Sequence, residues 1–128
     1  MRTLALAADM TKVNILGTEY TIEVKKYEED EAFERRSIDG YCDHCQKKIV
    51  VCDMTTYKGW ENEPKETAEI SQKQTIRHEI VHAFFNESGL EYSGLQYEGA
   101  WCKNEEMVDW IALQGEKIYK AWMEAGAL

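Results

Sequence analysis

The feature that most constrains the fold of this chain is a pair of histidines four positions apart, His78 and His82, with Glu79 between them. On a helix, positions four apart lie one turn apart, with roughly 6 Å of rise between their Cα atoms. Both imidazoles can then reach one metal ion at Zn–N distances of about 2.0–2.1 Å. The glutamate is placed to take a proton from water on that ion rather than to ligate it. The motif therefore predicts a helix that carries part of a metal site.

A zinc ion that keeps one position open for water needs a third protein ligand, and Glu105 is the leading candidate. Asp109 lies four residues further on and shares a helix face with Glu105, so it could accept the free ring N–H of a ligating histidine. Asn104 could orient the other imidazole in the same way, or could simply cap the helix. Glu106 is the rival ligand and ranks second, because the residue four beyond it is Trp110, which cannot serve as the carboxylate partner.

An HExxH motif followed after some twenty residues by an N-E-x-x-x-D element resembles the gluzincin class of zinc metallopeptidases, to which thermolysin belongs. The resemblance covers about residues 67–122, and the two motifs together are far more specific than either alone. It implies that His78, His82 and Glu105 are metal ligands. It also implies that Glu79 is the general base and that Asp109 holds a ligand in orientation. The chain departs from thermolysin in lacking the large substrate-binding subdomain and the downstream catalytic histidine.

The resemblance implies an enzyme that hydrolyses peptide bonds with one catalytic Zn²⁺, on which Glu79 activates a water molecule. The short chain is similar to small metallopeptidase-like proteins carried by phages and mobile elements, some of which act on repressors. A peptide or protein substrate, including a repressor-like regulator, is therefore the expected partner. The alternative is a non-catalytic, zinc-stabilised regulatory or docking domain, in which a residue such as Cys102 closes the fourth ligand position. Hydrolysis of a non-peptide amide is also compatible with these ligands.

Length and charge bound the remaining classes. The 128 residues fit one domain, residues 1–128, which can bury a modest core without disulfides. A net charge of −9 argues against a nucleic-acid-binding surface, which would carry a basic stripe. Residues 4–8 are apolar but too few to span a membrane and unlike a secretory signal. We therefore expect a soluble cytoplasmic protein, and the sequence leaves its oligomeric state open.

Cysteines form a second group of possible ligands. Cys42 and Cys45 have knuckle spacing, and His44 and Cys52 could complete a second metal site. However, no second C-x-x-C follows, His44 would have to bend back onto the same ion, and Cys52 continues a strand in which a buried thiol is ordinary. Free thiols in a reducing compartment are therefore the preferred interpretation. Cys102 precedes the second ligand helix, and nothing marks it as a nucleophile.

The first half of the chain reads as strands. Residues 13–16 and 19–24 alternate around a short turn, which predicts a hairpin. Residues 37–41 and 48–53 predict a second hairpin, and residues 28–36 between them read as a solvated loop or a short exposed helix. The expected fold class is α+β, with a small antiparallel sheet of about four strands packed on two main helices.

The second half reads as helices. After a connection over residues 54–66, one helix is expected over residues 65–88 and carries the HExxH motif. Its predicted buried side consists of Ile76, Ile80, Val81, Ala83 and Phe84, and Gly89 ends it. Another helix, over residues 104–124, carries the glutamate ligand. Its predicted buried side consists of Val108, Ile111, Ala112, Ile118, Tyr119 and Trp122.

The connection over residues 90–102 is expected to pass over the site. Tyr92 and Tyr97 are candidate catalytic residues there, because a phenol could stabilise the oxyanion of a tetrahedral intermediate. Packing beneath the connection is the alternative role for both tyrosines. His44 is another candidate donor if its hairpin borders the cleft. The hairpin over residues 38–53 is the best candidate for an exposed edge that takes an extended peptide by strand addition.

Overall fold

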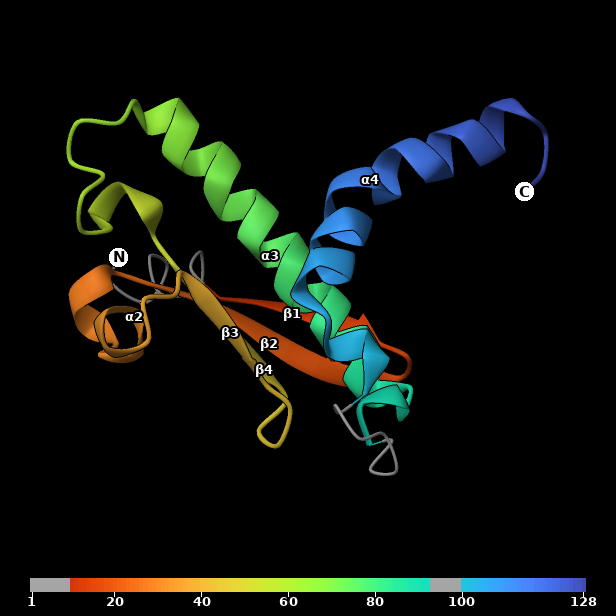
Figure 1. The fold of residues 1–128 in the computed structure, drawn as a ribbon, viewed down its shortest axis with the longest axis horizontal. Coiled ribbons are helices and arrows are strands. Elements are labelled where there is room, and N and C mark those ends of the chain that lie inside the picture. The colour runs from red at the N-terminus through yellow and green to blue at the C-terminus, as the bar shows by residue number, and fades with distance from the viewer. Residues whose placement is uncertain (1–9, 93–99) are drawn as a thin grey trace.

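The computed structural model describes residues 10–92 and 100–128. One sheet in the N-terminal half contains β1 (Met10–Ile15), β2 (Thr18–Lys25), β3 (Gly40–Asp43) and β4 (Lys48–Cys52), in the order β1-β2-β4-β3. Two long helices follow, α3 (Lys65–Glu87) and α4 (Glu105–Glu124) (Figure 1). The short helices are α2 (Ala32–Arg35), η1 (Tyr27–Glu29), η2 (Met54–Thr56), η3 (Leu90–Tyr92) and η4 (Trp101–Lys103). The predicted α+β class, a four-stranded sheet packed on two main helices, is confirmed.

Strand directions differ from the prediction in one respect. Both predicted hairpins form: β1 pairs antiparallel with β2, and β3 pairs antiparallel with β4. The first turn uses Leu16 and Gly17, whose φ angles of 51° and 92° suit a tight two-residue hairpin turn. However, β2 and β4 run parallel, so the sheet is mixed rather than wholly antiparallel. The chain passes through η1 and α2 to the far edge, where it forms β3, and returns between β2 and β3 as β4.

The central strand β4 is covered on both faces. Its last four residues, 49–52, are 0% exposed. Ile49 and Val51 belong to a core that α3 covers, together with Ile15, Tyr20, Ile22 and Ala83. Val50 and Cys52 belong to a second core, together with Phe33, Met54 and Ala68. Burial on both faces explains why β4 is a continuous apolar run rather than an alternating one.

Helix α3 has the expected bounds but a different buried face. It begins after Pro64 and ends at Glu87, and Gly89 follows with a φ of 87°, as is common just past a helix end. Ile76 and Ile80 pack, as predicted, against the core that contains Ile49 and Val51, but Phe84 is 41% exposed. Ala83 is buried as predicted, and the other buried positions of the helix are Ala68, Thr75, Glu79 and Asn86.

Close approach of α3 to β3 explains this choice of small and polar residues. A Cβ atom added at Gly40 of β3 would lie 2.7 Å from the Thr75 side chain and 3.6 Å from Glu79 Cγ. The backbone of β3 therefore passes directly beneath the middle of α3. A glycine on the strand allows the HExxH motif to sit against the edge of the sheet.

Among the described residues, helix α4 packs on the rest of the molecule mainly near its start. Val108 and Ala112 are its buried residues, as predicted. Tyr119 and Trp122 are 54% and 52% exposed, so their predicted burial is wrong. In Figure 1, α4 begins beside the C-terminal half of α3 and then diverges from it. A helical apolar period predicts a face but not whether another element covers that face. Within the described ranges, no helix combines the length and apolarity that a membrane span requires.

Candidate metal centre

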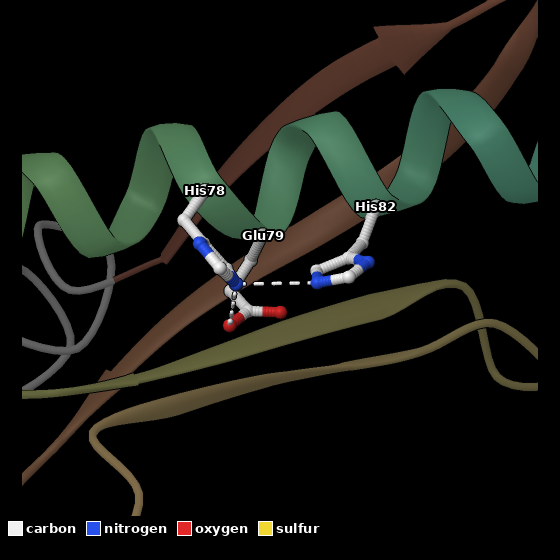
Figure 2. Close-up of side chains that lie close together, drawn as sticks. All are labelled: His78, Glu79 and His82. Carbon is white, nitrogen blue, oxygen red and sulfur yellow. Dashed lines mark hydrogen bonds and ion pairs between the residues drawn. The ribbon is translucent and has the colours of Figure 1, made fainter. Parts of the chain in front are cut away.

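Helix α3 presents His78, Glu79 and His82 toward the edge of the sheet (Figure 2). One donor atom from each of these residues lies within 4.8 Å of the other two. The two histidine Nε2 atoms are 3.2 Å apart, and the imidazole rings meet edge to face. The i, i+4 spacing of the sequence therefore brings both imidazoles to one point, as the helical repeat requires. The described residues contain a His-Glu-His cluster that is compatible with a metal ion.

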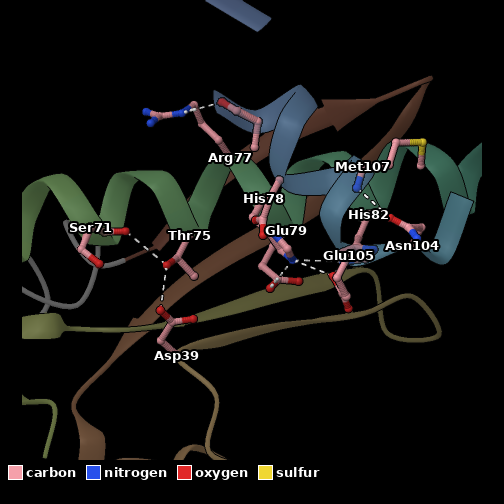
Figure 3. A network of polar contacts seen from close by, with 12 residues as sticks. Asp39, Ser71, Thr75, Arg77, His78, Glu79, His82, Asn104, Glu105 and Met107 are labelled. Atoms are coloured by element: carbon pink, nitrogen blue, oxygen red, sulfur yellow. Dashed lines mark hydrogen bonds and ion pairs between the residues drawn. The ribbon is translucent and has the colours of Figure 1, made fainter. Parts of the chain in front are cut away.

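Glu105, the first residue of α4, approaches the same point from the other helix (Figure 3). Its Oε1 atom lies 3.1 Å from His78 Nε2 and 2.9 Å from His82 Nε2. Glu79 is further away, with Oε2 3.9 Å from His78 Nε2. Among the described residues, Glu106, the rival candidate, forms no hydrogen bond or ion pair with either histidine. By distance, the carboxylate best placed to be the third ligand is that of Glu105.

The distances between the three donor atoms show whether a zinc ion would fit among them. Their separations of 2.9, 3.1 and 3.2 Å form a nearly equilateral triangle. Donors around a tetrahedral zinc ion with bonds of about 2.0–2.1 Å are separated by about 3.3–3.4 Å. The triangle therefore needs to widen only slightly to receive such an ion. Two imidazole nitrogens and one carboxylate oxygen also form a donor set that suits zinc.

Asp109 holds one of the histidines in orientation. Its Oδ1 atom lies 2.6 Å from His78 Nδ1, and it is one turn beyond Glu105 on α4. When His78 Nδ1–H donates to this carboxylate, the lone pair of Nε2 faces Glu105 and His82. Asp109 therefore lies within hydrogen-bonding distance of a histidine, as its predicted role requires. A second tie between the helices is a hydrogen bond from Arg77 Nε to the Ala112 carbonyl, at 3.2 Å.

The other histidine faces a different carboxylate from the one expected. Asn104 caps α4, because its Oδ1 atom accepts the Met107 N–H at 2.8 Å. The group facing His82 Nδ1 is instead Glu91 of η3, with Oε2 at 3.9 Å and a side chain only 11% exposed. Sequence reasoning missed Glu91, because no motif spacing links it to the histidines.

Glu79 is a buried carboxyl beside the metal-ligand candidates. The residue is 6% exposed, and burial raises the pKa of its carboxyl to about 7. The charge of His78 opposes this rise, the Glu105 and Asp39 carboxylates add to it, and Arg36 opposes it. Asp39 is itself tied to α3, since its Oδ2 atom lies 3.1 Å from the Thr75 hydroxyl (Figure 3). The Asp39–Thr75 contact holds the end of β3 against the helix beside Glu79.

A cleft of about 700 Å³ opens beside these residues. Its walls come from the segment before β3, from β3 itself, from the turn region after β4, and from α3 and the start of α4. His44 lines it, so the β3–β4 hairpin borders the cleft, which is the condition under which His44 is a candidate donor. The cleft is large enough for several residues of an extended peptide.

Strand β3 presents a free edge to this cleft. It is the last strand of the sheet, and no described strand pairs with its outer side. The Cys52 N–H donates to the Asp39 carbonyl at 2.8 Å, and Tyr41 is opposite Val50 in the register. Because hydrogen-bonded pairs alternate in an antiparallel ladder, the N–H and C=O groups of Gly40 and Cys42 point away from β4. Gly40 and Cys42 both line the cleft.

The cysteines do not form a second metal site within the described residues. All four are free thiols, and the one group there that could hold an ion is the cluster on α3. Burial raises the pKa of the Cys42 thiol to about 12 and that of Cys52 to about 11, so both stay protonated at neutral pH. Burial also raises the pKa of Cys102, and its thiol is not part of the cluster on α3.

The two tyrosine predictions fall at the limit of the described structure. Tyr92 is the last residue of η3, and the position of its side chain is outside the described part. Tyr97 lies outside the described residues altogether.

Comparison of the chain with models of protein families, with curated proteins and with solved structures finds no match.

Proposed function

We propose that this chain is a zinc-dependent metallopeptidase of the gluzincin type. The observation that carries the proposal is the convergence of His78 Nε2, His82 Nε2 and Glu105 Oε1 within 3.2 Å of one another. Beside them lie a buried carboxyl that is further from the histidines and an open cleft. The N-E-x-x-x-D element supports the same family, because both of its carboxylates contact the histidine pair.

A bound zinc ion supplies Lewis-acid chemistry: it polarises a carbonyl group and lowers the pKa of water. The remaining work falls to side chains. Glu79 takes one proton from the attacking water and delivers it to the amine nitrogen as the C–N bond breaks. Asp109 accepts the Nδ1 proton of His78 and so keeps the other ring nitrogen free to ligate.

Substrate would bind along the edge of β3. The outward N–H and C=O groups of Gly40 and Cys42 can hydrogen-bond an extended peptide, which would thereby add a strand to the sheet. This arrangement would lay the peptide backbone along the outer side of β3, away from β4, with Glu79 of α3 nearby. A peptide or a protein with an extended segment, such as a repressor-like regulator, is therefore the proposed substrate class.

A non-catalytic, zinc-stabilised docking domain is the second candidate function. The observation that favours it is the second half of α4, where Tyr119 and Trp122 are exposed and no described element covers them. In that case, the ion would fix α4 to α3 and present the apolar face of α4 to a partner.

Metal analysis and peptide cleavage separate these functions. The purified chain is expected to hold one zinc ion per molecule and to cleave members of a random peptide library. Glu79→Gln should keep the zinc and lose turnover, because it removes the proton acceptor while the ligands remain. Bound zinc without cleavage of any peptide would favour the docking domain, and cleavage by Glu79→Gln would remove Glu79 from the mechanism.

The ligand assignment has its own matched pair of variants. Glu105→Ala should lower the zinc content, whereas Glu106→Ala, one position along the same helical turn, should leave it unchanged. If the zinc content falls in Glu106→Ala and not in Glu105→Ala, the third ligand is Glu106 rather than Glu105.

A further inference from the structure

Arg36 stands out among the described residues that line the cleft, because it is the one arginine among them and none of them is a lysine. The other charged groups along the cleft are mostly carboxylates, including Asp39, Glu91 and Glu105. Arg36 therefore places a permanent positive charge in a cleft whose other charged groups are mostly acidic.

The neighbouring arginine serves as a comparison. Arg35 Nη1 lies 3.1 Å from Glu31 Oε1 one turn back, so its charge already has a partner, and Arg35 does not line the cleft. Arg36 is the C-cap residue of α2, and its side chain is exposed. Its guanidinium has no ion pair with any described residue. A guanidinium carries five N–H donors in a planar fork that fits a carboxylate, so this one is available to a ligand.

Aromatic side chains line the same cleft as Arg36. Tyr57 and Trp60 are half-buried there, and the Tyr57 hydroxyl donates to the Ile38 carbonyl at 3.0 Å. This hydrogen bond fixes one wall of the cleft against the segment that leads into β3.

The number of residues between Arg36 and Gly40 sets an upper limit on the distance from Arg36 to the candidate catalytic residue, Glu79. Gly40 is beside Glu79, as the 3.6 Å approach of its built Cβ to Glu79 Cγ shows. Arg36 precedes Gly40 by four residues, and an extended chain advances at most about 3.3–3.6 Å per residue. The two points are therefore no more than about 14 Å apart between their Cα atoms. A peptide lying along β3 would cover that distance with about four residues.

We propose that Arg36 is a specificity-determining residue, which selects peptides that carry a carboxylate within about four residues of the bond to be cleaved. The carboxylate belongs either to an acidic side chain or to the C-terminus of the peptide, since both present the same planar anion. This inference rests on the proposed peptidase function, because it assigns a substrate preference to that cleft.

Peptide binding tests the inference without requiring turnover. The probes are fluorescein-labelled hexapeptide pools in which one position is fixed as Glu, Gln or Lys, each prepared with a free and with an amidated C-terminus. They are titrated against zinc-loaded Glu79→Gln protein and against the same protein with Arg36→Gln or Arg35→Gln added, using fluorescence anisotropy at low salt. Circular dichroism checks that each variant is folded.

The Glu79→Gln protein should prefer either Glu over Gln at one position or the free over the amidated C-terminus, by about fivefold. Which of these pools binds more tightly identifies the source of the carboxylate. Arg36→Gln should abolish the preference, and Arg35→Gln should retain it. Absence of any preference, its survival in Arg36→Gln, or its equal loss in Arg35→Gln would overturn the proposal.

Charge reversal provides a gain-of-function readout. Arg36→Glu should reverse the preference, toward the Lys pools if the carboxylate is a side chain or toward the amidated peptides if it is the C-terminus, and loss of folding could not produce such a reversal. Cleavage assays with the intact Glu79 protein keep the two proposals apart. If the binding preference depends on Arg36 but the protein cleaves no peptide, the proposed peptidase function is wrong and the recognition of a carboxylate by Arg36 still holds. If the protein cleaves peptides with no dependence on Arg36, the peptidase function is supported and the proposed role of Arg36 is wrong.

Discussion

The two long helices of this molecule are similar in length but differ in how they are attached. Helix α3 has 23 residues and buries side chains along its whole length, from Ala68 to Asn86. Helix α4 has 20 residues and buries only Val108 and Ala112, both in its first half. The candidate metal centre lies where these two helices meet. Two of its donors therefore come from a helix anchored in the cores, and the third comes from a helix held mainly at one end.

Because of this difference, the two histidine ligands are already held in place before an ion binds, whereas the Glu105 side chain must be ordered by the ion. The side chains of His78 and His82 are 19% and 16% exposed, whereas that of Glu105 is 70% exposed. Restricted side chains lose little entropy when they bind an ion, and an exposed one loses more. A bound ion should therefore order the start of α4 more than it orders α3.

Metal removal is the experiment with the largest expected effect on this comparison. At a free zinc concentration about 100 times the dissociation constant, binding should stabilise the folded chain by about 2.7 kcal/mol. Thermal unfolding with zinc and with a chelator measures this difference. Hydrogen exchange should show that the chelator exposes residues 105–112 while the amides of α3 near Ala83 remain protected. Equal loss of protection in both helices would contradict a difference in attachment.

The carboxylates behind the two histidines give the next largest effect. Asp109→Asn should weaken zinc binding by about 10–100-fold, because Asp109 is 2.6 Å from His78 Nδ1. Glu91→Gln should weaken it by less than about tenfold, since Glu91 is 3.9 Å from His82 Nδ1 and no direct hydrogen bond is formed. Competition with a zinc-binding dye measures both. A larger loss in Glu91→Gln would make η3, rather than α4, the main support of the site.

Local patterns in the sequence predicted the parts of the fold that depend on local geometry. Pro64 and Gly89 mark the ends of α3, and Asn104 marks the start of α4, because each has a conformational or capping preference of its own. The contact between His78 and His82 follows from the helical repeat alone. The contact of Glu105 with both histidines depends on how two helices pack. The spacing of Glu105 to Asp109 and the resemblance to a family with the same pair of motifs made Glu105 the leading candidate, but neither gives the packing of the helices that produces the contact.

Features that depend on long-range packing were not predictable in the same way. The parallel pairing of β2 with β4 depends on where the chain crosses the sheet, although the continuous apolar run of β4 is typical of a central strand. Burial of Glu79 and Thr75 depends on the close approach of Gly40, which no helical period contains. Exposure of Trp122 depends on the absence of a covering element in the described structure.

The same substitution at two glycines should have opposite effects in the two regions. Gly40→Ala should destabilise the fold by about 1–3 kcal/mol, because the new Cβ would lie 2.7 Å from the Thr75 side chain and 3.2 Å from the Val50 carbonyl. Gly115→Ala, in the free half of α4, meets nothing within 4 Å and should stabilise its helix by about 0.5–1 kcal/mol. Urea unfolding measures both. Destabilisation of similar size at both positions would indicate that α4 packs as closely as α3.

Acid unfolding should reveal the smallest effect, at the C-terminal end of α3. Hydrogen bonds from Lys47, Tyr20 and Thr18 lower the pKa of Glu87 from 4.5 to about 2. The folded state holds this proton more weakly than the unfolded chain does. The contribution of Glu87 is therefore complete above pH 4.5 and is lost as the pH falls toward 2. Glu87→Gln should lower stability at neutral pH and flatten its dependence on pH between those values.

Glu116→Gln is the matched control on α4, where Glu116 forms an exposed i, i+4 pair with Lys120. Such a pair contributes little, so this variant should follow the unchanged chain across the same pH range in urea unfolding. A flattening of equal size in both variants would mean that the acid sensitivity reflects the net charge of −9. Flattening in Glu87→Gln alone would place it at the contact of α3 with β2 and the β3–β4 turn, which is the kind of tie that the second half of α4 lacks.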